Sequence, residues 1–147
     1  MNKNHSSEYL RGLLKELLLL PKETEWAEFK HNNDNPQEIG EYISALSNSA
    51  ALCGKAYAYL VWGISDITRD IVGTSFNPDT SKKGNEELEN WLLRLMNPHI
   101  EFEFHSFTAD NGNPIVILEI SRADKYPVKF QGQEYIRIGS YKKPLKD

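Results

Sequence analysis

The sequence of 147 residues contains a single cysteine, Cys53. An intrachain disulfide is therefore excluded, and so is a metal site built from paired thiolates. No apolar run approaches the roughly 20 residues that a membrane-spanning helix needs, and the polar N-terminus lacks the order of a secretory signal, in which basic residues precede apolar ones. These absences predict a cytoplasmic protein that does not use a membrane.

An overall excess of positive charge is lacking too. The 17 Lys and Arg residues are outnumbered by 21 Asp and Glu, which gives a net charge of −4 and argues against a general nucleic-acid binder. The charge is uneven, however: residues 121–147 carry seven bases and three acids, while residues 1–120 carry ten bases and eighteen acids. A basic edge on an acidic body can contact phosphates, although solvated lysines near a chain end are the commoner explanation.

A nucleotide-binding loop of the G-x-x-x-x-G-K-[ST] type is also lacking, because neither Gly54-Lys55 nor Lys83-Gly84 supplies it. The histidines do not have the spacing of metal ligands either. We interpret residues 1–6 as a frayed end, and His105, on the polar side of an alternating strand, as solvated. The sequence therefore predicts neither a nucleotide site nor a histidine-based metal site.

What is present is the patterning of one mixed α+β domain over residues 1–147, with a mainly antiparallel sheet flanked by about three helices. The apolar repeat from Ser7, the Asn35 cap with Pro36, and the acids Glu86 and Glu87 mark the three helix starts. Asn111-Gly112 marks a hairpin turn. The expected strands are 27–30, 57–64, 71–76, 100–107, 115–120, 128–130 and, as the last, 135–138.

Acidic residues near the first strand form the strongest candidate for chemistry. Alternation places Glu28 and Lys30 on one side of the strand, and Glu23, five residues before Glu28, joins them only from a preceding turn or through a bulge. Asp66 follows the next long strand, which we expect to lie beside the first. Three carboxylates at one sheet edge could hold Mg²⁺ or Mn²⁺, with Lys30 orienting water or stabilising charge on a phosphate.

That metal site would be lost if Glu28 instead formed a structural ion pair with Lys30 or Arg137. The basic residues near the C-terminus are the candidates for nucleic-acid contact. An arginine on the last strand could bind phosphate or pair with a surface acid, and aromatic rings there could stack on bases or belong to the core. The residues expected to contact nucleic acid are Lys129, Tyr135, Arg137, Lys142 and Lys143.

Several short motifs, taken in order, resemble the Schlafen-type AlbA-like domain over roughly residues 10–145. They are E-T-E-W-A-E-F-K at 23–30, S-A-L-S-N-S at 44–49, L-V-W-G-I-S-D at 60–66, I-V-G-T at 71–74, Y-P-V-K-F at 126–130 and Y-I-R-I-G-S at 135–140. The chain departs from the pattern after Asn48, where many members have a Gly-Gly pair and this sequence has a lone Gly54.

The resemblance implies a nucleic-acid-binding module of a bacterial transcriptional regulator, the function that we favour. Some Schlafen relatives are Mg²⁺- or Mn²⁺-dependent endoribonucleases, and their three catalytic acids correspond to Glu23, Glu28 and Asp66 in motif and spacing. Because those nucleases use two lobes, a single lobe is expected to act as a homodimer. A protein-contact or dimerisation module without a nucleic-acid role is the third hypothesis, and DNA or RNA is the expected partner of the first two.

Overall fold

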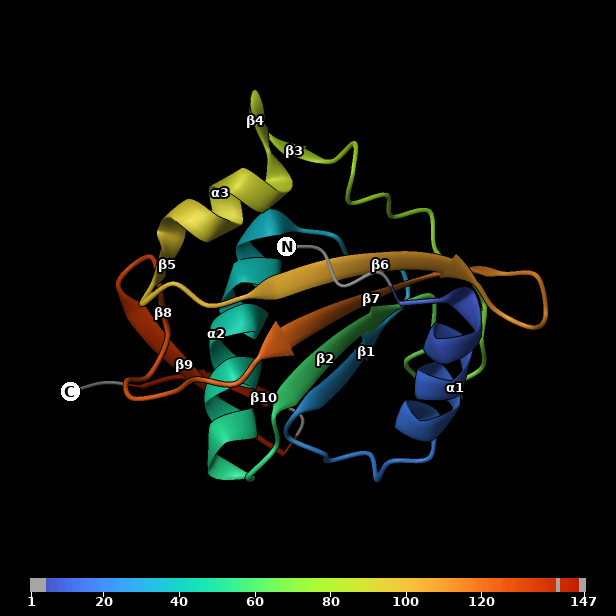
Figure 1. Cartoon of the computed structure of the whole chain (residues 1–147), viewed down its shortest axis with the longest axis horizontal. Helices are drawn as coiled ribbons and strands as arrows, with labels where there is room; N and C mark the ends of the chain where they lie inside the picture. The colour runs from blue at the N-terminus through green and yellow to red at the C-terminus, as the bar shows by residue number, and fades with distance from the viewer. Residues whose placement is uncertain (1–4, 140, 146–147) are drawn as a thin grey trace.

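The computed structural model describes residues 5–139 and 141–145, whose helices and strands are drawn in Figure 1. They form the α+β domain that the patterning predicts. The elements of the described residues are α1 (Ser7–Leu18), β1 (Ala27–Lys30), α2 (Pro36–Leu52), β2 (Tyr57–Trp62), β3 (Lys82–Lys83), β4 (Glu86–Glu87), α3 (Leu88–Leu95), β5 (Met96–Asn97), β6 (Phe102–Thr108), β7 (Pro114–Ser121), β8 (Lys129–Phe130), β9 (Gln133–Ile138) and β10 (Tyr141–Pro144).

The main sheet has the strand order β1-β2-β7-β6. β1 and β2 run parallel, whereas β2–β7 and β7–β6 are antiparallel. The parallel register places Lys30 opposite Trp62. The carboxyl ends of β1 and β2 therefore meet at one edge of the sheet, and the loop after β2 begins beside the end of β1.

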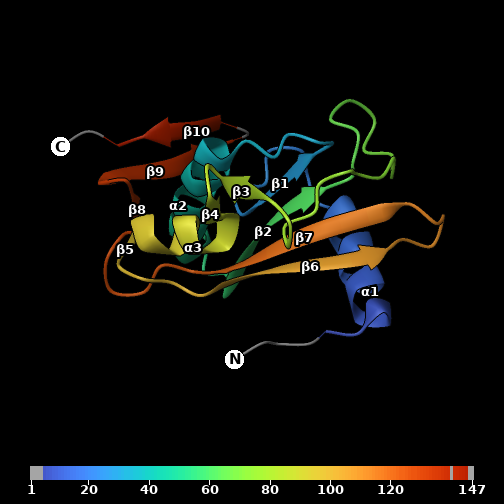
Figure 2. The same cartoon turned by 90° about the horizontal axis from the view of Figure 1, so that it is seen from above.

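The two faces of the main sheet are covered by different layers (Figure 2). α1 packs on one face through the stripe Leu10, Leu14 and Leu17, in a cluster that includes Ala27 and Phe29 of β1. α2 covers the opposite face, and α3 and a second sheet of order β10-β9-β8-β5 complete that side. The alternation expected along β1 is confirmed, since Ala27 and Phe29 are buried and Glu28 and Lys30 lie partly exposed on the other face.

α2 lies between the two sheets and is buried along most of its length, from Ile39 to Ala50. Its small polar side chains hydrogen-bond backbone groups of the second sheet and of the residue just before β8. The Ser44 hydroxyl donates to the Val128 carbonyl at 2.7 Å, and the Asn48 amide donates to the Tyr135 carbonyl at 2.9 Å. These bonds fix β9 against the helix.

Three local expectations are corrected. Residues 71–76 form only an isolated bridge, Ile64 to Ile71, and the Ile71 carbonyl accepts hydrogen bonds from the side-chain amides of Asn111 and Asn113. The acids at 86–87 form β4, paired with β3, so α3 begins at Leu88. A further strand, β10, follows the one expected to be last and pairs with β9.

No helix in the described ranges 5–139 and 141–145 is both long enough and apolar enough to cross a bilayer.

Candidate functional site

The three predicted acids line one pocket of about 370 Å³ at the β1 edge of the main sheet. Glu23 lies in the turn before β1, which resolves its odd spacing from Glu28, and Asp66 lies in the loop after β2. We call this the acid pocket. Its lining residues are Lys22, Glu23, Glu28, Phe29, Lys30, Ser65, Asp66 and Arg69.

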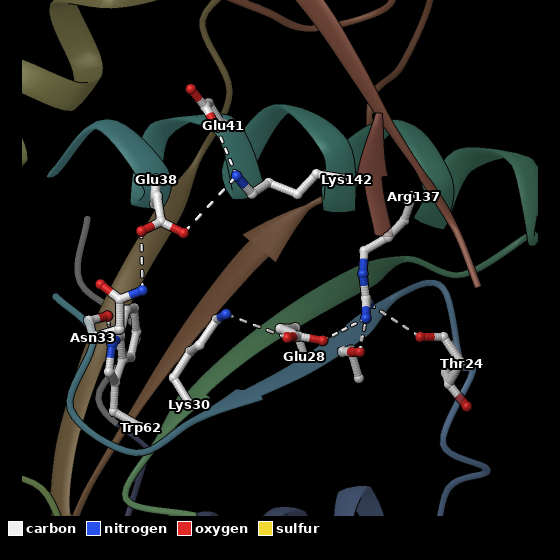
Figure 3. A network of polar contacts seen from close by, with 10 residues as sticks. Thr24, Glu28, Lys30, Asn33, Glu38, Glu41, Trp62, Arg137 and Lys142 are labelled. Carbon is white, nitrogen blue, oxygen red and sulfur yellow. Dashed lines mark hydrogen bonds and ion pairs between the residues drawn. The ribbon is translucent and has the colours of Figure 1, made fainter. Parts of the chain in front are cut away.

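Glu28 is held by two cations, as Figure 3 shows. The Arg137 guanidinium donates to one carboxylate oxygen, and the Lys30 ammonium lies 3.6 Å from the other. The side chain of Arg137 is 1% exposed and that of Glu28 is 18% exposed, so this is a largely buried ion pair. The sequence left open whether Glu28 pairs with Lys30 or with Arg137, and the structure shows that it pairs with both.

The other two acids of the pocket, Glu23 and Asp66, have fewer side-chain partners than Glu28. Within the described residues, neither Glu23 nor Asp66 accepts a side-chain hydrogen bond or forms an ion pair. The three acids are not among the groups of the described residues whose ligand atoms are placed closely enough to hold an ion. The three acids therefore share one pocket, but their carboxylates are not arranged around a single ion position. Metal binding there stays a prediction.

Lys30 lies on the α2 side of β1, with its ammonium 4.8 Å from the centre of the Tyr42 ring. Burial lowers the pKa of this ammonium, but the Tyr42 hydroxyl and the charges of Glu28 and Glu38 outweigh that effect and raise the pKa above its usual value. Lys30 therefore stays charged at neutral pH. It supplies a fixed positive charge at the rim of the acid pocket.

Arg137 is not at the surface. Besides its bond to Glu28, its guanidinium donates to the Ala27 carbonyl at 2.7 Å and the Thr24 carbonyl at 3.1 Å. The residue is 2% exposed, so a phosphate could reach it only if these partners separated. This burial revises the expectation that Arg137 contacts phosphate directly: its role is to hold Glu28 and the turn before β1 against β9.

The neighbouring lysines of β10 differ because successive strand residues face opposite sides. Lys142 points toward α2, where its ammonium lies 2.7 Å from Glu41 and 4.0 Å from Glu38 (Figure 3). Burial raises the pKa of Glu41, but hydrogen bonds from Lys142 and Gln37 lower it further than burial raises it. Lys143 is exposed. Lys142 is thus mainly a structural partner, and Lys143 is available to a ligand.

The remaining predicted contact residues lie nearby on the second sheet. Lys129 of β8 is exposed. Tyr135 of β9 is partly buried against the core, and burial together with the Glu41 carboxylate raises the pKa of its hydroxyl. Tyr135 can therefore offer only part of its ring for stacking. Lys146 and Asp147, which were counted in the charge of this end, lie outside the described residues.

Two further pocket residues were missed from the sequence. Lys22 lies in the same turn as Glu23, and its position beside that acid was the available signal. Arg69 donates to the carbonyls of Leu18 and Leu20 at the end of α1, and its guanidinium lies 4.7 Å from the centre of the Phe29 ring. Nothing in the sequence indicates that contact, because it joins segments about fifty residues apart.

Comparison with known proteins gives one family and two similar structures. Residues 23–146 match the family model described as Schlafen, AlbA_2. No curated protein matches the chain. The DIP2311 protein of Corynebacterium diphtheriae has a similar structure, with 16% identity and a TM-score of 0.54; the match covers 94% of this chain and 26% of that one.

The second similar structure is the N-terminal domain of a protein from Nitrosomonas europaea that is described as related to the ATP-dependent DNA helicase RecG. It shares 21% identity with this chain at a TM-score of 0.54, and the match covers 94% of this chain and 92% of that domain. At these identities the two structures support the fold alone. This chain spans about a quarter of the DIP2311 protein but nearly the whole of the helicase-related domain.

Proposed function

The chain belongs to the Schlafen, AlbA_2 family, and from this premise we propose that it is a nucleic-acid-binding module that contacts the phosphate backbone beside the acid pocket. The description of the Nitrosomonas europaea relative as related to a DNA helicase supports the association with nucleic acid. More specifically, we propose that this module is the nucleic-acid-binding part of a transcriptional regulator. The family resemblance implies that role.

The observation that carries this proposal is the presence of lysines in the acid pocket and of exposed lysines on the second sheet. Lys22 and Lys30 line the acid pocket, and Lys129 and Lys143 are exposed on the second sheet. Since the chain as a whole is negative, binding must depend on these few local charges. We therefore expect modest affinity that decreases steeply with added salt.

Fluorescence anisotropy with labelled duplex DNA, single-stranded DNA and hairpin RNA at several salt concentrations tests the proposal. The variant Lys22→Ala/Lys143→Ala should weaken binding to every sequence and reduce the slope of log K against log salt by about 0.9 per lost contact on duplex DNA. Lys82→Ala/Lys83→Ala is the matched control, because it removes the same charge from exposed β3, outside the acid pocket. Equal losses in both variants, or binding insensitive to salt, would refute a local site.

A second function, Mg²⁺- or Mn²⁺-dependent cleavage of RNA, is favoured by the presence of three carboxylates from three segments in one pocket. Carboxylate oxygens are the donors that hard divalent cations prefer, but the pairing of Glu28 with Arg137 and Lys30 leaves Glu23 and Asp66 as the acids available to an ion. Glu23 and Asp66 would hold the ion, with Glu28 joining if Lys30 moved away from it. A bound ion would supply charge stabilisation at the phosphoryl group. Lys30 would bind a non-bridging phosphate oxygen in the same pocket.

Cleavage of hairpin RNA in the presence of Mn²⁺ tests this second function. Asp66→Asn and Glu23→Gln are the informative variants, since neither breaks an ion pair of the described residues, whereas changing Glu28 also disturbs Arg137. Glu87→Gln on exposed β4 is the control. Sedimentation of the same samples tests the expected homodimer. Intact RNA with a verified dimer, or cleavage that survives both variants, would exclude this function.

A further inference from the structure

A second cluster of ionisable groups lies on the α1 face of the main sheet, and the proposed function makes no use of it. His105 of β6 and Glu119 of β7 are buried there, at 8% and 6% exposure. His5, which immediately precedes the N-cap residue of α1, reaches the same place. We call these three residues the histidine cluster. His5 is therefore not part of a frayed end, and His105 is not solvated as the alternating pattern predicted.

Two of the three separations in the histidine cluster match those of ligands around one ion. The Nε2 atoms of His5 and His105 lie 3.4 Å and 3.3 Å from the same Glu119 oxygen. Charge-assisted N–H···O bonds are shorter, about 2.7–2.9 Å. By contrast, tetrahedral zinc with bonds of about 2.0–2.2 Å separates neighbouring ligand atoms by roughly 3.3–3.5 Å. All three ligand atoms lie within 4.8 Å of one another.

The neighbouring groups hold these side chains in place. The Tyr9 ring stacks on His5 with centroids 4.3 Å apart, and the His5 and His105 rings are 4.9 Å apart. These ring contacts hold the His5 imidazole beside that of His105.

An acidic pocket of about 300 Å³ opens beside the cluster, lined in part by His5, His105, Asp79, Glu89 and Glu103. Burial raises the pKa of Glu89, and the charges of Asp79 and Glu103 raise it further. The local potential is therefore negative, which favours entry of a cation. The pocket also leaves room for water at a fourth ligand position.

We propose that His5, His105 and Glu119 form a binding site for a borderline divalent cation of the Zn²⁺ class, with a fourth position open to the adjacent pocket. Two imidazoles and one carboxylate with an open position are a known zinc arrangement. The ion would tie the segment before α1 to strands β6 and β7. The site is distinct from the acid pocket, whose all-oxygen donors suit Mg²⁺ or Mn²⁺ instead.

Isothermal titration of the untagged, metal-stripped chain with Zn²⁺ tests the site, supported by the visible absorption of Co²⁺, which reports tetrahedral coordination. We expect one ion per chain and a raised melting temperature, because the ion binds the folded state. His5→Ala and Glu119→Gln should each weaken binding by at least about 100-fold, since loss of a ligand should exceed the effect of losing an outer partner. His31→Ala and His99→Ala are the matched controls and should leave binding unchanged.

His5→Ala is the decisive variant because His5 precedes α1 and its loss should leave the core folded, which circular dichroism checks. Equal loss of affinity in His5→Ala and His31→Ala would overturn the site, as would the absence of stoichiometric Zn²⁺ binding to the folded wild-type chain. Mg²⁺ should give no heat that depends on His5. A Mg²⁺ or Mn²⁺ signal that depends on Asp66 would report the acid pocket, so the two sites can be distinguished.

Discussion

Each face of the main sheet carries a largely buried glutamate, but the two glutamates have different partners. Glu28, on the α2 face, is bound by Arg137 and Lys30, so its charge is neutralised within the chain. Glu119, on the α1 face, meets two histidines at a single oxygen. The difference shows that burial alone does not define the role of a carboxylate. A carboxylate bound by fixed cations is a structural group, whereas one shared by two imidazoles resembles a ligand set.

The largest effect should come from breaking the ion pair on the α2 face. Arg137→Met removes the partner of Glu28 and the bonds to the Ala27 and Thr24 carbonyls. We expect the free energy of unfolding to decrease by about 3–5 kcal/mol, because a buried acid and two carbonyls lose their donor. Urea unfolding measures this decrease. Arg94→Met, which breaks the exposed pair with Glu86, should leave the urea midpoint nearly unchanged. Equal losses of stability in the two variants would contradict the difference between the buried and the exposed ion pair.

A second test compares the helices that cover the two faces. A Cβ on Gly40 of α2 would lie 2.2 Å from the Phe130 ring, whereas one on Gly12 of α1 would meet nothing within 4 Å. Gly40→Ala should therefore destabilise the fold by about 1–3 kcal/mol. Gly12→Ala should stabilise it by about 0.5–1 kcal/mol through helix propensity.

Thermal unfolding of the two glycine variants measures these changes. Phe130→Leu combined with Gly40→Ala should recover part of the loss, because the smaller side chain relieves the clash. Two glycine variants of equal stability would show that α2 is not packed as tightly as its position between the sheets implies.

Adjacent lysines of β10 give a smaller contrast. Lys142→Met should lower the free energy of unfolding by about 1 kcal/mol, because Glu41 loses a close and partly buried partner. Lys143→Met should change stability by less than about 0.5 kcal/mol and instead weaken nucleic-acid binding. Chemical unfolding and anisotropy on the same two proteins check this separation; a reversed order would mean that Lys142 is the residue that contacts the ligand.

The smallest effect concerns acid stability on the α1 face. The pKa of Glu119 is lowered in the folded chain, so its stabilising contribution is fully present above the ordinary value of 4.5 and is lost as pH falls through the lower folded value. Glu119→Gln should therefore reduce the pH dependence of stability just below pH 4.5. Melting temperatures measured without metal from pH 3 to 8 test this, with Glu8→Gln on α1 as the control.

Much of the fold follows from local patterns. The cap Asn35 with Pro36 correctly marks the start of α2, and Asn111-Gly112 correctly marks the turn between β6 and β7. The strand expected at 71–76 is reduced to one bridge in the described residues, where distant groups such as the side-chain amides of Asn111 and Asn113 bond the Ile71 carbonyl. Sequence patterns do not contain such long-range contacts.

The candidate site was predicted in part. The acids Glu23, Glu28 and Asp66 do line one pocket. Parallel pairing of β1 and β2 places the loop after β2, with Asp66, beside the end of β1, and the turn before β1 brings Glu23 to the same pocket. The surface role expected of Arg137 was not found, since β9 lies against α2 and turns that side chain inward. Strand alternation indicates which residues share a face but not which face is covered.

By itself, the sequence determined the α+β class, the start of α2 and the β6–β7 turn, because periodicity and capping act over a few residues. Only the tertiary structure decided that Arg137 is buried, that Lys142 is paired while Lys143 is free of such a pair in the described residues, and that His5 meets His105. Each of those outcomes depends on segments far apart in the chain, and packing of the second sheet on α2 or of α1 on the main sheet brings them together.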